Sequence, residues 1–145
     1  MRVSMESVGT QPLFRATGEK SGYTMMVEVR GGEGVAPEGP YPMELIAMGL
    51  GGCLADNIVV ILNKKRVTFT GVRMDIEADR APESPKRFTA VRIRCTVQGS
   101  DLPQADLDKI IELAAKYCSA HATLSEGTPI STLGVVEKAP AVRGR

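Results

Sequence analysis

One stretch of this 145-residue chain limits its possible folds more than any other. Residues 45–62 are apolar almost throughout, with Asp56 and Asn57 as the polar exceptions. The length and spacing predict a helix from Pro42 to about Arg66. A helix that is apolar nearly all round has to be covered on several sides, so we expect it to be the central element of the fold.

Both ends of this predicted helix carry recognisable signals. Pro42 suits the first helical position because the N–H that it lacks would be unpaired there in any case. Glu44 in the first turn complements the helix dipole, and the basic residues 64–66 suit the C-terminal end.

Three glycines precede Cys53 inside the predicted helix, at positions 49, 51 and 52. Each costs about 1 kcal/mol relative to alanine in a helix interior, so a compensating contact is expected. Two compatible reasons for them are close packing by another backbone and room for a ligand beside the thiol.

The rest of the chain predicts an α+β fold. Residues 1–30 alternate in places and indicate two or three short strands, and the Gly- and Pro-rich residues 31–42 indicate a loop. After the first helix, two half-buried strands joined by a loop are predicted, and we expect them to be antiparallel. A second helix follows, and its buried stripe ends at Cys118. A helical turn and a last strand complete the chain. Their ranges are 72–79 and 91–98 for the strands, about 101–118 for the helix, 123–127 for the turn and 129–137 for the last strand.

Composition narrows the class of protein. Length and apolar content favour a single domain over 1–145, with a frayed tail from about 138. The formal net charge of +1 gives no broad field for gathering phosphates, so neither nucleic acid nor a membrane surface is an expected partner. The first residues lack a signal-peptide core, and we count no window close to a membrane span, which predicts a cytoplasmic protein.

The three cysteines are too few and too scattered for a disulfide framework of a secreted protein. Cys95 falls on the apolar face of a predicted strand and is interpreted as a small core residue. Cys53 and Cys118 lie on apolar helix faces, with no second Cys or His at metal-ligand spacing beside Cys53. This arrangement favours thiol chemistry.

Two motifs carry a resemblance to a known family. Residues 42–66 read PMELIAMGLGGCLADNIVVILNKKR, and residues 116–124 read KYCSAHATL. Together with the loop at 80–88 and its flanking strands, they resemble the OsmC/Ohr family of thiol-dependent hydroperoxide reductases, in its YhfA-like branch. The resemblance covers most of residues 13–136.

The resemblance implies a function and an assembly. Cys53 would be the peroxidatic thiol and Cys118 the resolving thiol of a haem-free antioxidant peroxidase that reduces organic hydroperoxides to alcohols. It also implies an intertwined homodimer, with two principal helices per chain packed against antiparallel sheet, and an external dithiol of the lipoyl type as reductant. No metal or bound cofactor is expected. The apolar neighbours of Cys53 favour organic substrates over hydrogen peroxide.

Two positions depart from the family pattern, in which an Arg and a Glu hold the thiolate and the peroxide. Met43 follows the helix-starting proline, and Glu44 comes one residue later. Lys20 stands where the arginine is expected, and lysine cannot form the two-pronged contact of a guanidinium. Lys20 and Glu44 are therefore the candidate supporting residues, and the other candidate cations are Arg15, Arg30 and Arg87.

Three alternative roles for the cysteines stay open. Without activation, two thiols in apolar surroundings would be inert core residues. Cys53 and Cys118 with His121 would offer zinc ligands. A non-catalytic member of the same family would instead bind a small apolar ligand at the dimer interface.

Overall fold

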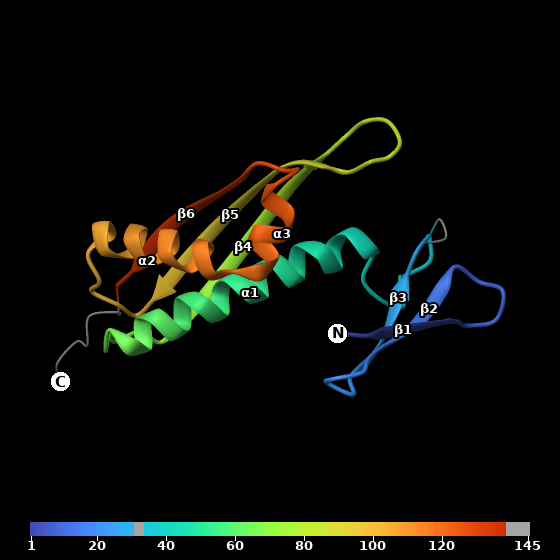
Figure 1. Ribbon diagram of the computed structural model, residues 1–145, viewed down its shortest axis with the longest axis horizontal. Helices are drawn as coiled ribbons and strands as arrows, with labels where there is room; N and C mark the ends of the chain where they lie inside the picture. The colour runs from blue at the N-terminus through green and yellow to red at the C-terminus, as the bar shows by residue number, and fades with distance from the viewer. Residues whose placement is uncertain (31–33, 139–145) are drawn as a thin grey trace. The chain divides into compact units, whose positions relative to one another are not determined.

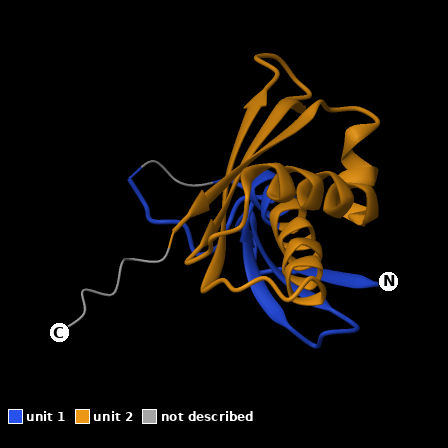
Figure 2. Cartoon of the chain, turned by 90° about the vertical axis from the view of Figure 1, so that its left-hand side faces the viewer, with its two compact units in different colours: residues 1–48 blue, residues 49–145 orange. Residues whose placement is uncertain are grey.

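The computed structural model describes residues 1–30 and 34–138, in two compact units, Met1–Met48 and Gly49–Arg145 (Figure 2). The single domain predicted over 1–145 stays a prediction. Of the predicted tail, residues 139–145 lie outside the described residues, as do the first three residues of the predicted 31–42 loop.

The first unit contains a three-stranded antiparallel sheet. Its strands are β1 (Val3–Ser7), β2 (Leu13–Gly18) and β3 (Thr24–Glu28), hydrogen-bonded in that order. The alternation in residues 1–30 predicted two or three strands joined by hairpins, and three are present. Gly22 adopts a φ of 67° in the turn between β2 and β3, a backbone conformation that favours glycine.

Helix α1 (Pro42–Lys64) matches the predicted helix to within two residues. At its start the Glu44 carboxylate accepts the Tyr41 N–H at 2.9 Å, which satisfies a donor just before the first turn. At its end Arg66 has a φ of 56°, and the Val67 N–H donates to the Leu62 carbonyl at 3.0 Å. A left-handed residue followed by such a bond ends a helix in the Schellman arrangement.

The second unit contains the sheet β4 (Gly71–Arg80), β5 (Phe88–Gln98) and β6 (Ile130–Glu137), in that order. β4 and β5 are antiparallel, as predicted, but β6 runs parallel to β5. The expectation of purely antiparallel sheet therefore holds only in part. A parallel neighbour requires a long crossover, and the helical segment between β5 and β6 supplies it.

That crossover consists of α2 (Gln104–Tyr117) and α3 (Ser119–Ser125). Cys118 is buried at the end of the α2 stripe, as predicted, but the helix itself ends one residue earlier, because Cys118 has extended backbone angles, with φ −83° and ψ 111°, and separates the two helices. The helical turn predicted at 123–127 begins earlier, at Ser119. Cys118 thus lies at a break in the helix.

Both principal helices pack on one face of the second sheet (Figure 1). The core comprises side chains from α1, β5 and α2, all below 3% exposed: Leu50, Leu54, Ile58, Leu62, Val91, Ile93, Cys95, Val97, Leu107, Ile110 and Ala114. At Gly134 of β6 an added Cβ would lie 2.7 Å from Ile111 and 2.9 Å from Leu107 of α2. The predicted α+β class, with two principal helices on a sheet, is confirmed.

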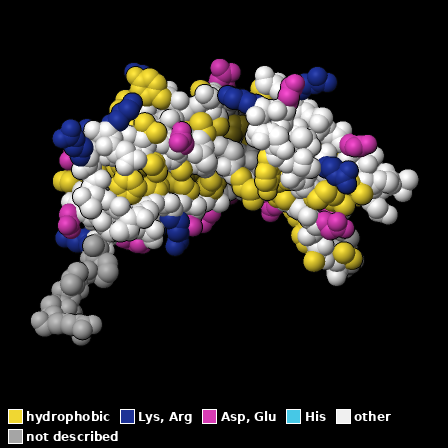
Figure 3. Space-filling view, turned by 90° about the horizontal axis from the view of Figure 1, so that it is seen from below, with side chains coloured by type: hydrophobic (Ala, Val, Ile, Leu, Met, Phe, Trp, Pro, Cys, Tyr) yellow, Lys and Arg dark blue, Asp and Glu magenta, His cyan; other side chains and the backbone are white. Residues whose placement is uncertain are grey.

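Helix α1 also presents apolar side chains to the surface. Met48 is 57% exposed, and Ile46 and Val60 are about 40% exposed. Hydrophobic side chains gather in bands on the face seen in Figure 3. An 18-residue window of α1 is apolar enough to cross a membrane, so the expectation that no window comes close was wrong. The buried row of Leu50, Leu54, Ile58 and Leu62 instead packs as a core stripe in the fold.

Candidate functional site

The structure brings together two thiols that are 65 residues apart in the chain. Cys53 lies in the middle of α1, and Cys118 lies between α2 and α3. Their Sγ atoms are 2.9 Å apart, and the Cys118 thiol donates a hydrogen bond to Cys53. Both are free thiols rather than a disulfide.

The start of α3 surrounds this pair with backbone donors. The extended backbone of Cys118 makes it the N-cap residue of α3, and its sulfur accepts the His121 N–H at 3.3 Å. The amides of Ser119 and Ala120 also donate to Cys53. Sequence reasoning missed these donors, because it ended α2 at Cys118 and began the next helical turn only at 123, whereas α3 starts at Ser119.

The two thiols have opposite acidities. The hydrogen bond from Cys118 lowers the pKa of Cys53 below its ordinary value, and the Ala120 amide adds to this. Burial and the charge of Asp56 oppose the shift, and the Ser119 amide supports it. Burial, followed by the bond to Cys53, raises the pKa of Cys118. The thiolate of the pair therefore forms on Cys53.

Access to solvent separates the thiols in the same way. Cys53 is partly exposed, whereas Cys118 is fully buried. Around Cys53 a Cβ added to Gly52 would meet no atom of the described residues within 4 Å, while one added to Gly51 would overlap Ile76 of β4. Gly51 therefore serves packing, although against a side chain rather than another backbone, and room for a ligand beside the thiol stays a prediction.

Cys95 differs from both of them. It is fully buried on β5, and burial raises its pKa to about 11. A thiol in this state is inert at neutral pH, as predicted for a core residue.

The predicted supporting residues belong to the first unit. Lys20 is exposed in the turn after β2, and the Glu44 carboxylate binds the Tyr41 amide at the start of α1. Their roles beside the thiol stay predictions, as do those of Arg15 and Arg30, which are also exposed in this unit.

Arg87 is the remaining candidate cation. It belongs to the second unit, and its Nη1 donates to the Phe88 carbonyl at 3.2 Å. The causes that lower the pKa of Cys53 are hydrogen bonds, whereas sequence reasoning assigned that effect to a cation.

Metal ligands do not gather in the described part of the chain. Over residues 1–30 and 34–138, no group of three or more His, Cys, Asp or Glu side chains is arranged to hold a metal ion. His121 contributes its backbone amide to the thiol pair. The geometry therefore gives no support to the zinc alternative.

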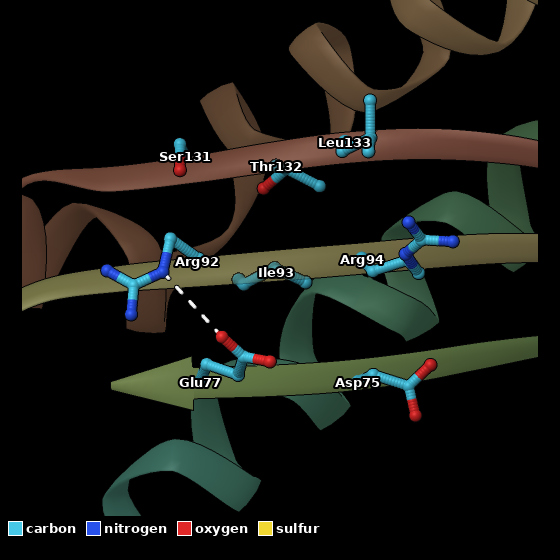
Figure 4. Close-up of a pocket in the computed structure, with 8 residues that line it drawn as sticks. All are labelled: Asp75, Glu77, Arg92, Ile93, Arg94, Ser131, Thr132 and Leu133. Carbon is cyan, nitrogen blue, oxygen red and sulfur yellow. Dashed lines mark ion pairs between the residues drawn. The ribbon is translucent and has the colours of Figure 1, made fainter. Parts of the chain in front are cut away.

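A separate hollow of about 370 Å³ lies on the solvent-facing side of the second sheet (Figure 4). Charged side chains of neighbouring strands face one another across it, including Glu77 and Arg92 at 3.8 Å. Arg92 is also held by Asp79 in a two-pronged contact of 2.6 and 2.8 Å. These mutually neutralising pairs are typical of a solvated sheet face.

Comparison with known proteins places this chain in a family. The profile described as OsmC-like protein matches residues 32–133, which is more than two thirds of the chain. The chain belongs to the OsmC-like protein family. Protein YhfA of Escherichia coli strain K12 is 31% identical over 112 residues, which cover 77% of this chain and 81% of YhfA.

Solved structures of other proteins share the fold. An OsmC-like protein from Mycoplasma pneumoniae superposes with a TM-score of 0.80 at 14% identity, covering 94% of this chain and 96% of that one. The organic hydroperoxide resistance protein OhrB of Bacillus subtilis superposes with a TM-score of 0.67 at 12% identity, covering 92% of this chain and 96% of that one. The predicted OsmC-like fold is confirmed.

Proposed function

We propose that this protein is a thiol-dependent peroxidase that reduces organic hydroperoxides to alcohols, with Cys53 as nucleophile and Cys118 as resolving thiol. The observation that carries the proposal is the pair of sulfur atoms 2.9 Å apart, one more acidic and partly exposed, the other less acidic and buried. A peroxidatic thiol must ionise and must be accessible to the peroxide. A resolving thiol needs only to lie close enough to attack the oxidised sulfur.

The proposed reaction has two steps on the protein. The Cys53 thiolate attacks the terminal peroxide oxygen, the O–O bond breaks, and the departing alkoxide takes a proton to become the alcohol. Cys53 is left as a sulfenic acid. Cys118 then attacks that sulfur, a disulfide forms, and water leaves. An external dithiol, of the lipoyl type or similar, restores both thiols by two thiol–disulfide exchanges and is itself oxidised to a disulfide.

The family context supports this assignment. OhrB of Bacillus subtilis is named an organic hydroperoxide resistance protein, and so is an OsmC from Legionella pneumophila that shares the fold with a TM-score of 0.68. At 12% and 15% identity these neighbours support the fold. The thiol geometry of this chain supports the chemistry. A role in the response to peroxide stress in the cytoplasm follows from the same proposal.

The proposal includes a homodimer. Each unit of the chain has apolar surface that a second copy would cover. In the first unit, the sheet and the start of α1 line an open hollow of about 590 Å³ with mostly apolar side chains, among them Met5, Tyr23, Val29 and Ile46. In the second unit, Val60 and Leu113 are exposed. Lys20 and Glu44 are proposed to support the thiolate and peroxide in that assembly.

Hydroperoxide consumption in the presence of a dithiol tests the function. The wild-type protein should consume cumene hydroperoxide, and Cys53→Ser should abolish the reaction because the nucleophile is lost. Cys95→Ala is the matched control and should keep the activity. Full activity in Cys53→Ser would exclude the proposed nucleophile, and equal rates with hydrogen peroxide would reject the preference for organic substrates.

Binding of a small apolar ligand without turnover is the second candidate. A cavity of about 380 Å³ between α1 and α2, lined by Val60, Ile61, Leu113 and Tyr117, favours it. Saturable binding of a fluorescent apolar probe that persists in Cys53→Ser, with no peroxide consumed by the wild type, would select this function instead.

A further inference from the structure

A side-chain hydrogen bond joins the two thiol-bearing helices beside the site. Asn57 lies four residues after Cys53 on α1, and Ala114 lies four residues before Cys118 on α2. The Asn57 amide donates from Nδ2 to the Ala114 carbonyl at 3.3 Å. Residues four apart on a helix share a face, so Asn57 projects from the same face of α1 as Cys53.

The accepting carbonyl has lost its helical partner. In a continuous helix the Ala114 carbonyl would accept the N–H of residue 118. Here α2 ends at Tyr117, and the Cys118 N–H donates instead to the Ala115 carbonyl at 3.2 Å. Ala114 is fully buried, where an unpaired carbonyl is costly. Asn57 therefore donates to a carbonyl that the break at Cys118 deprives of the N–H four residues on.

We propose that Asn57 is a positioning residue for the thiol pair. Its amide stabilises the end of α2 at Tyr117, and so stabilises the turn of the chain that directs the Cys118 sulfur toward Cys53. Asn57 does not touch the sulfur atoms in this role. The inference rests on the proposed thiol chemistry only in requiring that the two thiols react with each other.

The expected consequence is a change in how readily the two thiols combine. When glutathione disulfide oxidises the pair, the Cys53–Cys118 disulfide forms and two molecules of glutathione are released. The equilibrium constant measures how well the reduced protein already holds its thiols together. Without the Asn57 amide the reduced state gains freedom that the disulfide must remove, so the disulfide is disfavoured.

Asn57→Leu tests the inference, because leucine is of similar size but has no donor. Its equilibrium constant with glutathione should fall about tenfold, which corresponds to about 1.4 kcal/mol. The pH of half-maximal alkylation of Cys53 should also rise, because the hydrogen bond from Cys118 is weakened. Asn57→Gln keeps the amide and should recover part of both effects.

Asn63→Leu is the matched control. It makes the same change in the last turn of α1, where the side chain is exposed. Its equilibrium constant should stay within about twofold of the wild type. Measurement on folded protein separates positioning from stability, since a purely structural role would lower the melting temperature and leave the thiol equilibrium unchanged.

An equilibrium constant for folded Asn57→Leu within about twofold of the wild type would overturn the inference. If that variant does not fold, Asn57→Ser decides by the same criterion, since its shorter hydroxyl falls short of the Ala114 carbonyl. The readout is independent of peroxide. Failure of the wild type to consume hydroperoxides would remove the proposed function, while a tenfold effect of Asn57→Leu on the thiols would still support the positioning role.

Discussion

Cys53 and Cys95 are the same residue type in two opposite environments of one fold. The Cys53 sulfur meets a thiol donor and the backbone amides at the start of α3, and its pKa is lowered. The Cys95 sulfur lies among the core side chains of β5, and burial raises its pKa to about 11. The donors at hand, rather than the apolar sequence context that both share, decide which thiol can react.

The largest expected difference is in alkylation. With a pKa of about 11, only about one Cys95 thiol in ten thousand is ionised at pH 7, against a few per cent for an ordinary thiol. Cys95 is also fully buried. We expect iodoacetamide to modify Cys53 at least about 100 times faster than Cys95 in the folded protein, as measured by mass spectrometry of digests. Similar rates at the two sites would break the comparison.

The surroundings of Cys95 should also be more tightly packed than those of Cys53. Gly134 pairs with Cys95 across β5 and β6, and a Cβ there would press on Leu107 and Ile111. Gly134→Ala should therefore lower the free energy of unfolding by about 2 kcal/mol.

Gly52→Ala is the matched change beside Cys53. An added Cβ meets no atom of the described chain within 4 Å, so it should be neutral or stabilise α1 by up to about 1 kcal/mol. Urea unfolding measures both variants. If Gly52→Ala instead lowers the free energy of unfolding, and this decrease grows with protein concentration, a second subunit fills the open space.

The sequence predicted most of the elements around these sites, because periodicity and helix-end signals are local. The ends of α1 and the alternation of β4 and β5 follow from side chains within a few residues. The break at Cys118 does not, since the apolar spacing from Leu107 onward fits a continued helix. At the break the Ala114 carbonyl accepts from the Asn57 amide, which is distant in sequence and so invisible to a local pattern.

The same reason explains what was missed at the site. The motifs named Cys53 and Cys118, but nothing local showed that backbone amides of Ser119 and Ala120 would activate the first thiol. The parallel placement of β6 also depends on a crossover and not on its own residues. Sequence reasoning therefore located the reactive residues and left out the donors that make them different.

The next largest effect concerns Cys118, the thiol that donates a hydrogen bond to Cys53. Cys118→Ala removes the hydrogen bond that contributes most to the lowered pKa of Cys53, so that pKa should rise. The alkylation rate of Cys53 at pH 7 should fall about three- to tenfold. In Cys118→Ser a hydroxyl donor remains, so the alkylation rate of Cys53 should fall less. A pH profile of alkylation that is the same in wild type and Cys118→Ala would show that the backbone amides alone set the acidity.

The smallest effect is on the pH dependence of stability, where the two thiols have opposite signs. The pKa of Cys95 is raised above its unfolded value. Its contribution to the free energy of unfolding is therefore complete below about pH 8.5 and is lost as pH rises through about 11. The pKa of Cys53 is lowered, so its contribution is present above about pH 8.5 and is lost as pH falls through the folded value.

Between pH 7 and 9 the free energy of unfolding should fall by on the order of 1 kcal/mol because of Cys95. Cys95→Ala should remove this pH-dependent decrease. Urea unfolding at several pH values compares the slopes, which separates this effect from any uniform loss of packing in the variant. Cys118 also has a raised pKa and contributes with the same sign as Cys95, so the slope is compared between proteins that both keep Cys53 and Cys118. If the alkaline slope stays unchanged in Cys95→Ala, burial does not keep that thiol protonated, and its inertness must come from lack of access alone.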